Sequence, residues 1–179
     1  MSDDISRRAF VGAAGTIALW LAASPADLLA ASNPDQGTYK VLTPDQVAAF
    51  DAFAAQVIPS EPGSGGAREA NVVRFTDNAL ASFASDQRPA FTSALASLGR
   101  RFASLPPAQQ VAAMRALDKS NHDAFEVLRT PVLAGMFANP SYGGNANRTG
   151  WKLIGFEDRF SWKPPFGFYD TPTEAARHD

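Results

Sequence analysis

Between residues 43 and 138 the apolar positions recur every three or four residues, which is the spacing of amphipathic helices. The run Thr43-Pro44-Asp45-Gln46 is typical of a helix start. Thr43 can cap the helix, Pro44 suits its first position, and Gln46 can close a capping box. Pro59 is expected to end this helix. Its apolar face is predicted to consist of Val47, Phe50, Ala54 and Val57.

Two further helices follow a loop that contains Pro62 and three glycines. One is predicted over residues 68–83, and the next begins at Pro89. The first presents an apolar face of Val72, Thr76, Ala79, Leu80 and Phe83. The second presents a stripe of Phe91, Leu95, Leu98 and Phe102. We expect both faces to belong to an ordinary hydrophobic core.

The last two predicted helices begin at clear signals. Pro106 and Pro107 break the preceding helix and start a fourth, and Asn121 can cap a fifth. Pro131 is expected to kink this fifth helix or split it near Thr130, because its ring clashes with the preceding turn. The apolar positions are Val111, Met114 and Leu117 in the fourth helix, and Phe125, Leu128, Val132 and Met136 in the fifth.

No window shows the alternation of a strand, so the fold class is predicted to be all-α. The expected architecture is a small bundle of four to five helices joined by short loops, followed by an irregular aromatic-rich C-terminal segment. Eight of the nineteen aromatic residues lie between Tyr142 and Tyr169. The stretch from Trp162 to Asp170 contains two prolines and is not expected to be a regular helix. A segment so rich in aromatic rings needs a hydrophobic surface to lie against.

The first thirty residues have the pattern of an export signal. Ser6-Arg7-Arg8-Ala9-Phe10 precedes a modest alanine-rich apolar stretch, which is typical of the twin-arginine route. The stretch is too short and too weakly apolar for a membrane span. Small residues allow cleavage after Ala26 or after Ala31. The chain then divides into a signal (1–31), a linker (32–42), a helical core (43–138), a Gly/aromatic-rich segment (139–170) and a polar tail (171–179).

Composition narrows the possible chemistry. The chain has no cysteine, which excludes disulfides, thiolate-bound iron–sulfur clusters and cysteine-attached haem. Its two histidines, His122 and His178, are too few and too far apart for a histidine-rich metal site. The net charge of −2, without a dense Lys/Arg stripe, argues against a nucleic-acid partner.

The sequence reveals no candidate catalytic, cofactor-binding or metal-binding residues. The Gly63–Gly66 cluster lacks the G-x-G-x-x-G spacing and is interpreted as a loop. The carboxylates on the predicted helices form no evident acid/base pair, and His122 is interpreted as a paired or solvent-exposed side chain. Glu126 and Arg129 are three residues apart and can pair on one helix face. This pattern favours an accessory role.

Tyr142-Gly143-Gly144-Asn145 differs in kind from the other loops. Two glycines allow backbone angles closed to other residues, and Asn145 can satisfy backbone groups in a turn. One interpretation is a tight turn that packs Trp151 back onto the bundle. The other is a shaped loop at a subunit interface, and the two are compatible.

With these motifs the chain resembles the small subunit of membrane-bound gluconate 2-dehydrogenase, the subunit 3 family. The resemblance covers most of the chain after the signal. It rests most on Phe125–Arg129, on Asn139 to Asn145 with the following Gly150-Trp151, and on Trp162 to Asp170.

The resemblance implies a partner rather than an activity of the chain alone. Such small subunits associate with a large FAD-dependent flavoprotein of the glucose–methanol–choline type, often with a membrane-bound cytochrome c subunit that carries haem. The small subunit supplies the export signal, and the twin-arginine translocase carries both to the periplasm, where the complex associates with the inner membrane. No cofactor is expected in this chain itself.

We therefore predict two functional regions. Arg7, Arg8 and Phe10 form the export signal. The partner interface is predicted to include Tyr142, Gly143, Gly144, Asn145, Trp151, Trp162, Phe166, Phe168 and Tyr169. Two alternatives stay open at this point: an escort or structural module for a different exported oxidoreductase, and an independent periplasmic enzyme.

Overall fold

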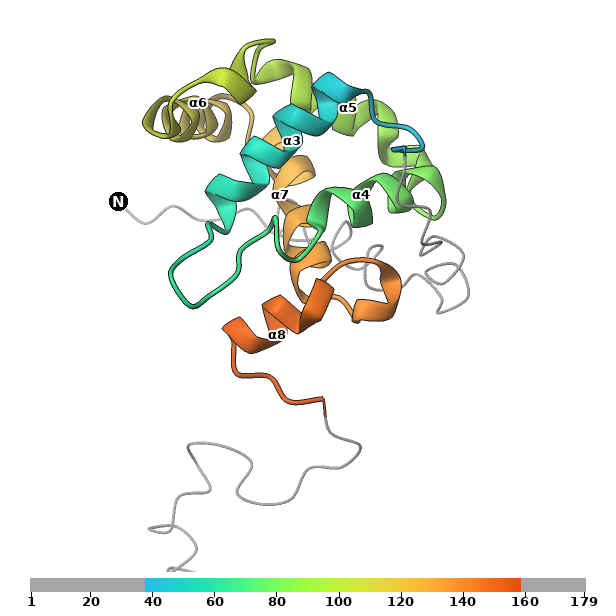
Figure 1. Cartoon of the computed structure of the whole chain (residues 1–179). Helices are drawn as coiled ribbons and strands as arrows, with labels where there is room; N and C mark the ends of the chain where they lie inside the picture. Colours follow the sequence, from blue (N-terminus) through green and yellow to red (C-terminus); the bar gives the residue numbers. More distant parts are fainter. Residues whose placement is uncertain (1–37, 159–179) are drawn as a thin grey trace, which may run out of the picture.

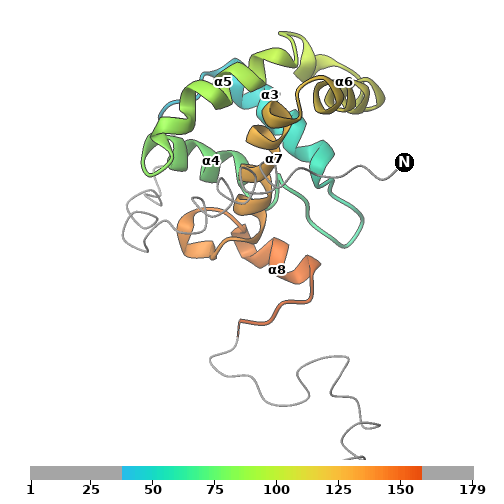
Figure 2. The same cartoon turned by 180° about the vertical axis from the view of Figure 1, so that it is seen from behind.

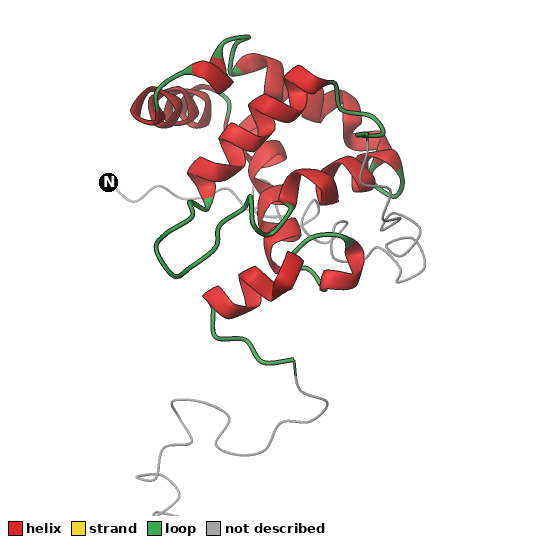
Figure 3. Ribbon diagram, in the orientation of Figure 1, coloured by secondary structure: helices red, strands yellow, loops and turns green. Residues whose placement is uncertain are grey.

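The computed structural model describes residues 38–158, and this part of the chain folds into six α-helices without a strand (Figures 1 and 3). The all-α prediction is therefore confirmed. The helices are α3 (Pro44–Val57), α4 (Val72–Ala81), α5 (Arg88–Ser97), α6 (Pro107–Ser120), α7 (His122–Phe137) and the short α8 (Thr149–Leu153). Four 3₁₀ turns connect them: η1 (Ser85–Gln87), η2 (Phe102–Ser104), η3 (Pro140–Tyr142) and η4 (Ala146–Arg148).

Helix α7 is the central element, and α3, α4, α5, α6 and α8 all contact it. Figures 1 and 2 show it passing through the middle of the molecule, with α6 at one end and α8 at the other. Buried apolar side chains from α3, α4, α5, α6 and α7 form the core. The most deeply buried include Phe50 and Phe53 of α3, Leu80 of α4, and Leu128, Val132 and Met136 of α7.

Both predicted N-caps are confirmed. The Thr43 hydroxyl accepts from the Gln46 backbone N–H, while the Gln46 side chain accepts from the Thr43 N–H, which completes the capping box. The Asn121 side chain accepts from the Ala124 N–H at the start of α7. The Glu126–Arg129 pair also forms on α7, with an Nη1–Oε2 distance of 3.1 Å.

The second helix is shorter than predicted. It begins at Val72 rather than Arg68, because Asn71 adopts a left-handed conformation with φ 59° and separates the helix from the preceding turn. It ends at Ala81, so Phe83 lies beyond it. The Arg88 side chain reaches back to donate to the Leu80 carbonyl, 2.8 Å from Nη2, and thereby caps this end.

The third helix also ends early. The sequence places Leu98 and Phe102 on its apolar stripe, but α5 ends at Ser97 and Gly99 then turns the chain with φ 88°. Phe102 lies in η2 instead and is still buried, with 1% of its surface exposed. The stripe thus identified the buried residues correctly but not the element, because glycine adopts positive φ at no steric cost.

Pro131 does not split the fifth helix. Helix α7 runs unbroken from His122 to Phe137 with Pro131 buried inside it. The proline lacks the N–H that would complete the intrahelical ladder. Of the two outcomes predicted, a kink or a split, the continuous helix excludes the split, because packing on several sides holds α7 together despite that missing bond. The kink stays a prediction.

The signal residues Arg7, Arg8 and Phe10 and the aromatic residues Trp162, Phe166, Phe168 and Tyr169 lie outside the described residues. Within residues 38–158, no helix has both the length and the hydropathy to cross a membrane.

Candidate functional site: the cap of helix α7 and its surroundings

The C-terminal end of α7 is enclosed by the loop of residues 139–150, here called the cap loop. The last carbonyls of a helix have no intrahelical partner and need donors from elsewhere. Asn145 and Trp151 supply three such donors to the end of α7. The Gly135 carbonyl accepts from the Asn145 N–H at 2.7 Å, and the Ala138 carbonyl accepts from Asn145 Nδ2 at 2.9 Å. Trp151 Nε1 donates to the Phe137 carbonyl at 3.0 Å.

Asn145 is the centre of this arrangement. It is fully buried and adopts φ 45°, a left-handed conformation that asparagine tolerates better than most residues. Its Oδ1 accepts from the Gly150 N–H at 2.8 Å while its Nδ2 caps α7. One side chain therefore connects the helix end, the cap loop and the start of α8.

Two glycines allow the loop to approach this closely. Gly144 lies against the backbone of Gly135, and Gly150 lies against the carbonyl oxygen of Met136. A Cβ atom at either position would overlap these carbonyl groups. The glycines are needed because two stretches of backbone touch without intervening side chains.

The cap loop also contacts the loop between α3 and α4. The Ala146 N–H donates to the Ala70 carbonyl at 3.1 Å. The methyl group of Thr149 lies close to Gly65, where an added Cβ would be 2.6 Å away. The cap loop thus joins α7 to a segment some seventy-five residues earlier in the sequence and forms a stable platform for α8.

The structure separates the predicted interface residues into two groups. Gly144, Asn145 and Trp151 are buried within the chain, whereas Tyr142 and Gly143 are partly exposed. The tight turn that packs Trp151 onto the bundle is confirmed. The role of this loop at a subunit interface stays a prediction, and the buried members can contribute to it only by shaping the surface.

After Trp151 the chain exposes large hydrophobic side chains to solvent. Leu153, Ile154 and Phe156 are the large hydrophobic residues most exposed in the described chain, at 46%, 59% and 43% of their surface. We call these three residues the ridge. The rings of Phe156 and Trp151 pack edge-on, with their centroids 5.1 Å apart. The Phe156 N–H donates to the Trp151 carbonyl at 2.8 Å. The buried platform therefore fixes the position of the ridge.

A second polar anchor, which the sequence did not predict, holds the N-terminal end of the described chain. Asp77 is fully buried in α4, and its carboxylate accepts three successive backbone N–H groups. The distances are 2.7 Å from Lys40, 3.0 Å from Val41 and 2.9 Å from Leu42. The sequence signal is an aspartate flanked by Thr76 and Asn78 in a helix of mainly apolar residues, and this does not identify the partner.

Residues 38–42, here called the strap, are held by α4 at a second point as well. Arg74 Nη1 donates to the Thr38 carbonyl at 2.8 Å, and its guanidinium lies 4.3 Å from the centre of the Tyr39 ring. Leu42 is buried in the core. The last residues of the segment predicted as a linker are therefore packed on the bundle.

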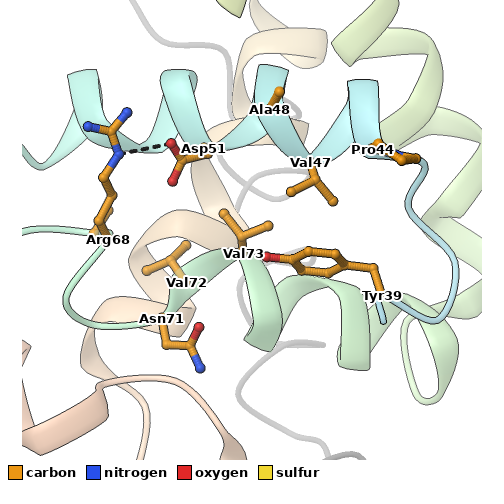
Figure 4. A pocket seen from close by; sticks show the side chains of 10 residues that line it. Tyr39, Pro44, Val47, Ala48, Asp51, Arg68, Asn71, Val72 and Val73 are labelled. Carbon is orange, nitrogen blue, oxygen red and sulfur yellow. Dashed lines mark hydrogen bonds and ion pairs between the residues drawn. The ribbon is translucent and has the colours of Figure 1, made fainter. Parts of the chain in front are cut away.

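A pocket of about 350 Å³ lies between α3 and the start of α4 (Figure 4). Tyr39 and Val47 line one part of it, and Asp51 and Arg68 lie at the other, joined by an ion pair of 2.8 Å. Because these two charges satisfy one another, the pocket presents no arranged acid/base pair. Residues 38–158 also contain no group of three or more His, Cys, Asp and Glu side chains that could hold a metal ion.

Two further titratable side chains, Glu69 and His122, form hydrogen bonds at the surface. In the glycine-rich loop, Glu69 accepts from the Ser60 hydroxyl at 2.6 Å and from the Gly66 N–H at 2.7 Å, which lowers the pKa of its carboxyl. His122 lies 2.7 Å from Asp118, and this hydrogen bond raises the pKa of the imidazole. His122 is therefore an exposed, paired histidine, as expected.

The fold is a helical bundle whose cap loop packs on the C-terminal end of α7 and supports an exposed apolar surface. In a comparison with known protein families, the family described as gluconate 2-dehydrogenase subunit 3 matches residues 44–158. The chain belongs to this family, and membership implies association with other subunits of a dehydrogenase complex. No curated protein and no solved structure matches the chain.

Proposed function

We propose that this chain is the non-catalytic small subunit of an exported FAD-dependent sugar or sugar-acid dehydrogenase. The observation that carries the proposal is the family match over residues 44–158, preceded in the same chain by the twin-arginine pattern at Arg7 and Arg8. The large subunit is a flavoprotein of the glucose–methanol–choline type, with a haem c cytochrome as a third component where the complex has one.

In this proposal the small subunit escorts its partner. It binds the folded flavoprotein before export, supplies the signal to the twin-arginine translocase, and stays bound in the periplasm at the inner membrane. An interface that survives transport should be large, roughly 2,000 Å² or more of total buried area. The aromatic residues Trp162, Phe166, Phe168 and Tyr169 are suited to provide such area, because tryptophan and tyrosine are enriched among residues that dominate binding energy.

The first test is a native pull-down of the chain, tagged at Asp179, from the membrane and periplasmic fractions of its own host. We expect a co-purifying flavoprotein and a flavin absorption band, with a haem band added where a cytochrome is present. A colourless single chain from a gentle preparation would contradict the proposal.

The second test addresses export. Replacing Arg7 and Arg8 by lysine should retain both subunits in the cytoplasm, whereas replacing Trp162 and Phe166 by alanine should retain only the flavoprotein. Continued export of the flavoprotein with the lysine variant would rule out the escort role.

A further inference from the structure

The ridge gathers the exposed large hydrophobic residues of the part of the chain that the structure describes. Leu153, Ile154 and Phe156 lie within four residues of one another and each exposes more than two fifths of its surface. Single exposed apolar residues are normal in proteins, but a cluster of them marks an interaction surface. The exposed side chains of Arg148, Lys152, Glu157 and Asp158 flank the ridge, and Arg148 Nη2 lies 4.0 Å from Asp158 Oδ2, so the edge of the ridge carries charges of both signs.

The ridge is also held in place before any partner binds. Trp151 lies beneath it, fixed by its bond to the Phe137 carbonyl and by its contact with the Phe156 ring. The Ile154 N–H donates to the Gly150 carbonyl at 3.2 Å. A surface that is already ordered loses little conformational entropy on binding, which favours affinity.

The area of the ridge indicates what kind of partner covers it. A stable interface takes about 20–30 residues from each side. Three partly exposed side chains supply far less, so two copies of this chain that met only at their ridges would bind weakly. The ridge leads directly into residues 159–179, which begin three residues after Phe156 and carry Phe160, Trp162, Phe166, Phe168 and Tyr169. It therefore fits one end of a longer interface.

We infer that the ridge of Leu153, Ile154 and Phe156 is the first contact site for the flavoprotein subunit, and that the cap loop supports it from beneath. This inference rests on the proposed function and specifies which surface of the small subunit performs it. The complementary surface on the flavoprotein is an apolar depression. Gly144 and Asn145 are buried and only shape this surface.

The test uses the absence of cysteine from this chain, because a single introduced cysteine then reports on one place only. Ile154→Cys is compared with Ala112→Cys, which lies on an exposed position of α6 at the other end of the molecule (Figures 1 and 2). Each full-length variant is treated with a maleimide, once as the isolated subunit and once in the co-purified complex.

We expect the cysteine at position 154 to react rapidly in the isolated subunit and at least about tenfold more slowly in the complex. The cysteine at position 112 should react equally in both. Equal reaction at position 154 in both samples would overturn the inference. Slow reaction there in the isolated subunit would overturn it too, because residues 159–179 or a second copy would then cover the ridge.

A second pair of variants measures the contribution to binding. Ile154→Ser should weaken binding of the flavoprotein by about tenfold, whereas Ala112→Ser should leave it unchanged. The helical circular dichroism of both should match that of the original chain. If the unaltered chain captures no flavoprotein, the proposed function fails; if the chain and Ile154→Ser capture it equally well, only the assignment of the ridge fails.

Discussion

The strap at residues 38–42 and the cap loop at residues 139–150 are both connecting segments held on the bundle, but they are held by opposite chemistry. The strap presents three backbone N–H groups and needs an acceptor, which the Asp77 carboxylate provides. The cap loop meets the carbonyl end of α7, which needs donors, and these come from Asn145 of the loop and from Trp151 directly after it. Each segment thus supplies what the facing backbone lacks.

The two segments also differ in the number and kind of contacts that hold them. The strap depends on one buried charge, with Arg74 as a peripheral addition. The cap loop combines several hydrogen bonds with close backbone contact at Gly144 and Gly150. We therefore expect the strap to be released by one polar substitution, whereas the cap loop should be most sensitive to added volume.

Gly150→Ala should have the largest effect of all. The new methyl group overlaps the Met136 carbonyl oxygen, so the end of α7 or the start of α8 must move. We expect a loss of about 3 kcal/mol of unfolding free energy, measured by urea denaturation. Gly63→Ala is the control: Gly63 has φ 84° but no neighbour within 4 Å, so it should cost only about 1 kcal/mol. Equal losses would mean that steric contact is not what limits the cap loop.

Asn145→Ala should be almost as damaging. It removes the bonds to the Ala138 carbonyl and from the Gly150 N–H, and it places alanine in a left-handed conformation. We expect a loss of about 3 kcal/mol in urea denaturation, against about 2 kcal/mol for Asn145→Gly, which retains the backbone freedom. The difference between the two variants isolates the conformational contribution from the hydrogen bonds. A glycine variant no more stable than the alanine variant would show that backbone conformation is unimportant here.

Asp77→Ala should release the strap. It leaves the N–H groups of Lys40, Val41 and Leu42 without their acceptor, and we expect a loss of about 2–3 kcal/mol. Hydrogen exchange at residues 40–42 should accelerate while the amides of α7 stay protected. Asp77→Asn keeps one carbonyl oxygen, which can still serve Val41 and Leu42, and should lose only about 1 kcal/mol. Faster exchange throughout the molecule would show that the strap and the core unfold together.

Trp151→Phe tests the single hydrogen bond that the indole donates to the end of α7. The variant loses the Nε1 donor to the Phe137 carbonyl but keeps an aromatic ring beneath Phe156. We expect a loss of about 1 kcal/mol in thermal or urea unfolding. A loss as large as that of Asn145→Ala would mean that the indole, and not the asparagine, is the centre of the cap.

The His122–Asp118 pair lies in neither anchor and serves as the reference with the smallest effect. The pKa of His122 is raised by its hydrogen bond to Asp118. The pair therefore stabilises the protein fully below the ordinary histidine pKa of about 6.5, and this contribution is lost as pH rises through the raised value. Because both side chains are well exposed, we expect only a slight decline in stability between pH 6 and 8. His122→Gln should remove that decline; an unchanged pH profile would contradict the pairing.

The sequence by itself determined the helical pattern, because periodic apolar residues and local caps act within a few residues of one another. The capping box at Thr43, the N-cap at Asn121 and the burial of the stripe Phe91, Leu95, Leu98 and Phe102 all follow from such short-range rules. The helix ends at Asn71 and Gly99 were missed, because a left-handed residue can interrupt an apolar stripe without changing its spacing. At Pro131 the sequence left a kink and a split open, and only the tertiary structure excluded the split, because packing can hold a helix together across a proline.

Only the tertiary structure decided which polar residues matter. Asp77 faces backbone groups that lie 35–37 residues earlier in the chain, and no local rule connects an aspartate with such a partner. The Tyr142-Gly143-Gly144-Asn145 motif was visible in the sequence, but its closeness to the end of α7 was not. The same holds for the exposure of Leu153, Ile154 and Phe156, because an apolar residue becomes a surface feature only when the rest of the fold leaves it uncovered.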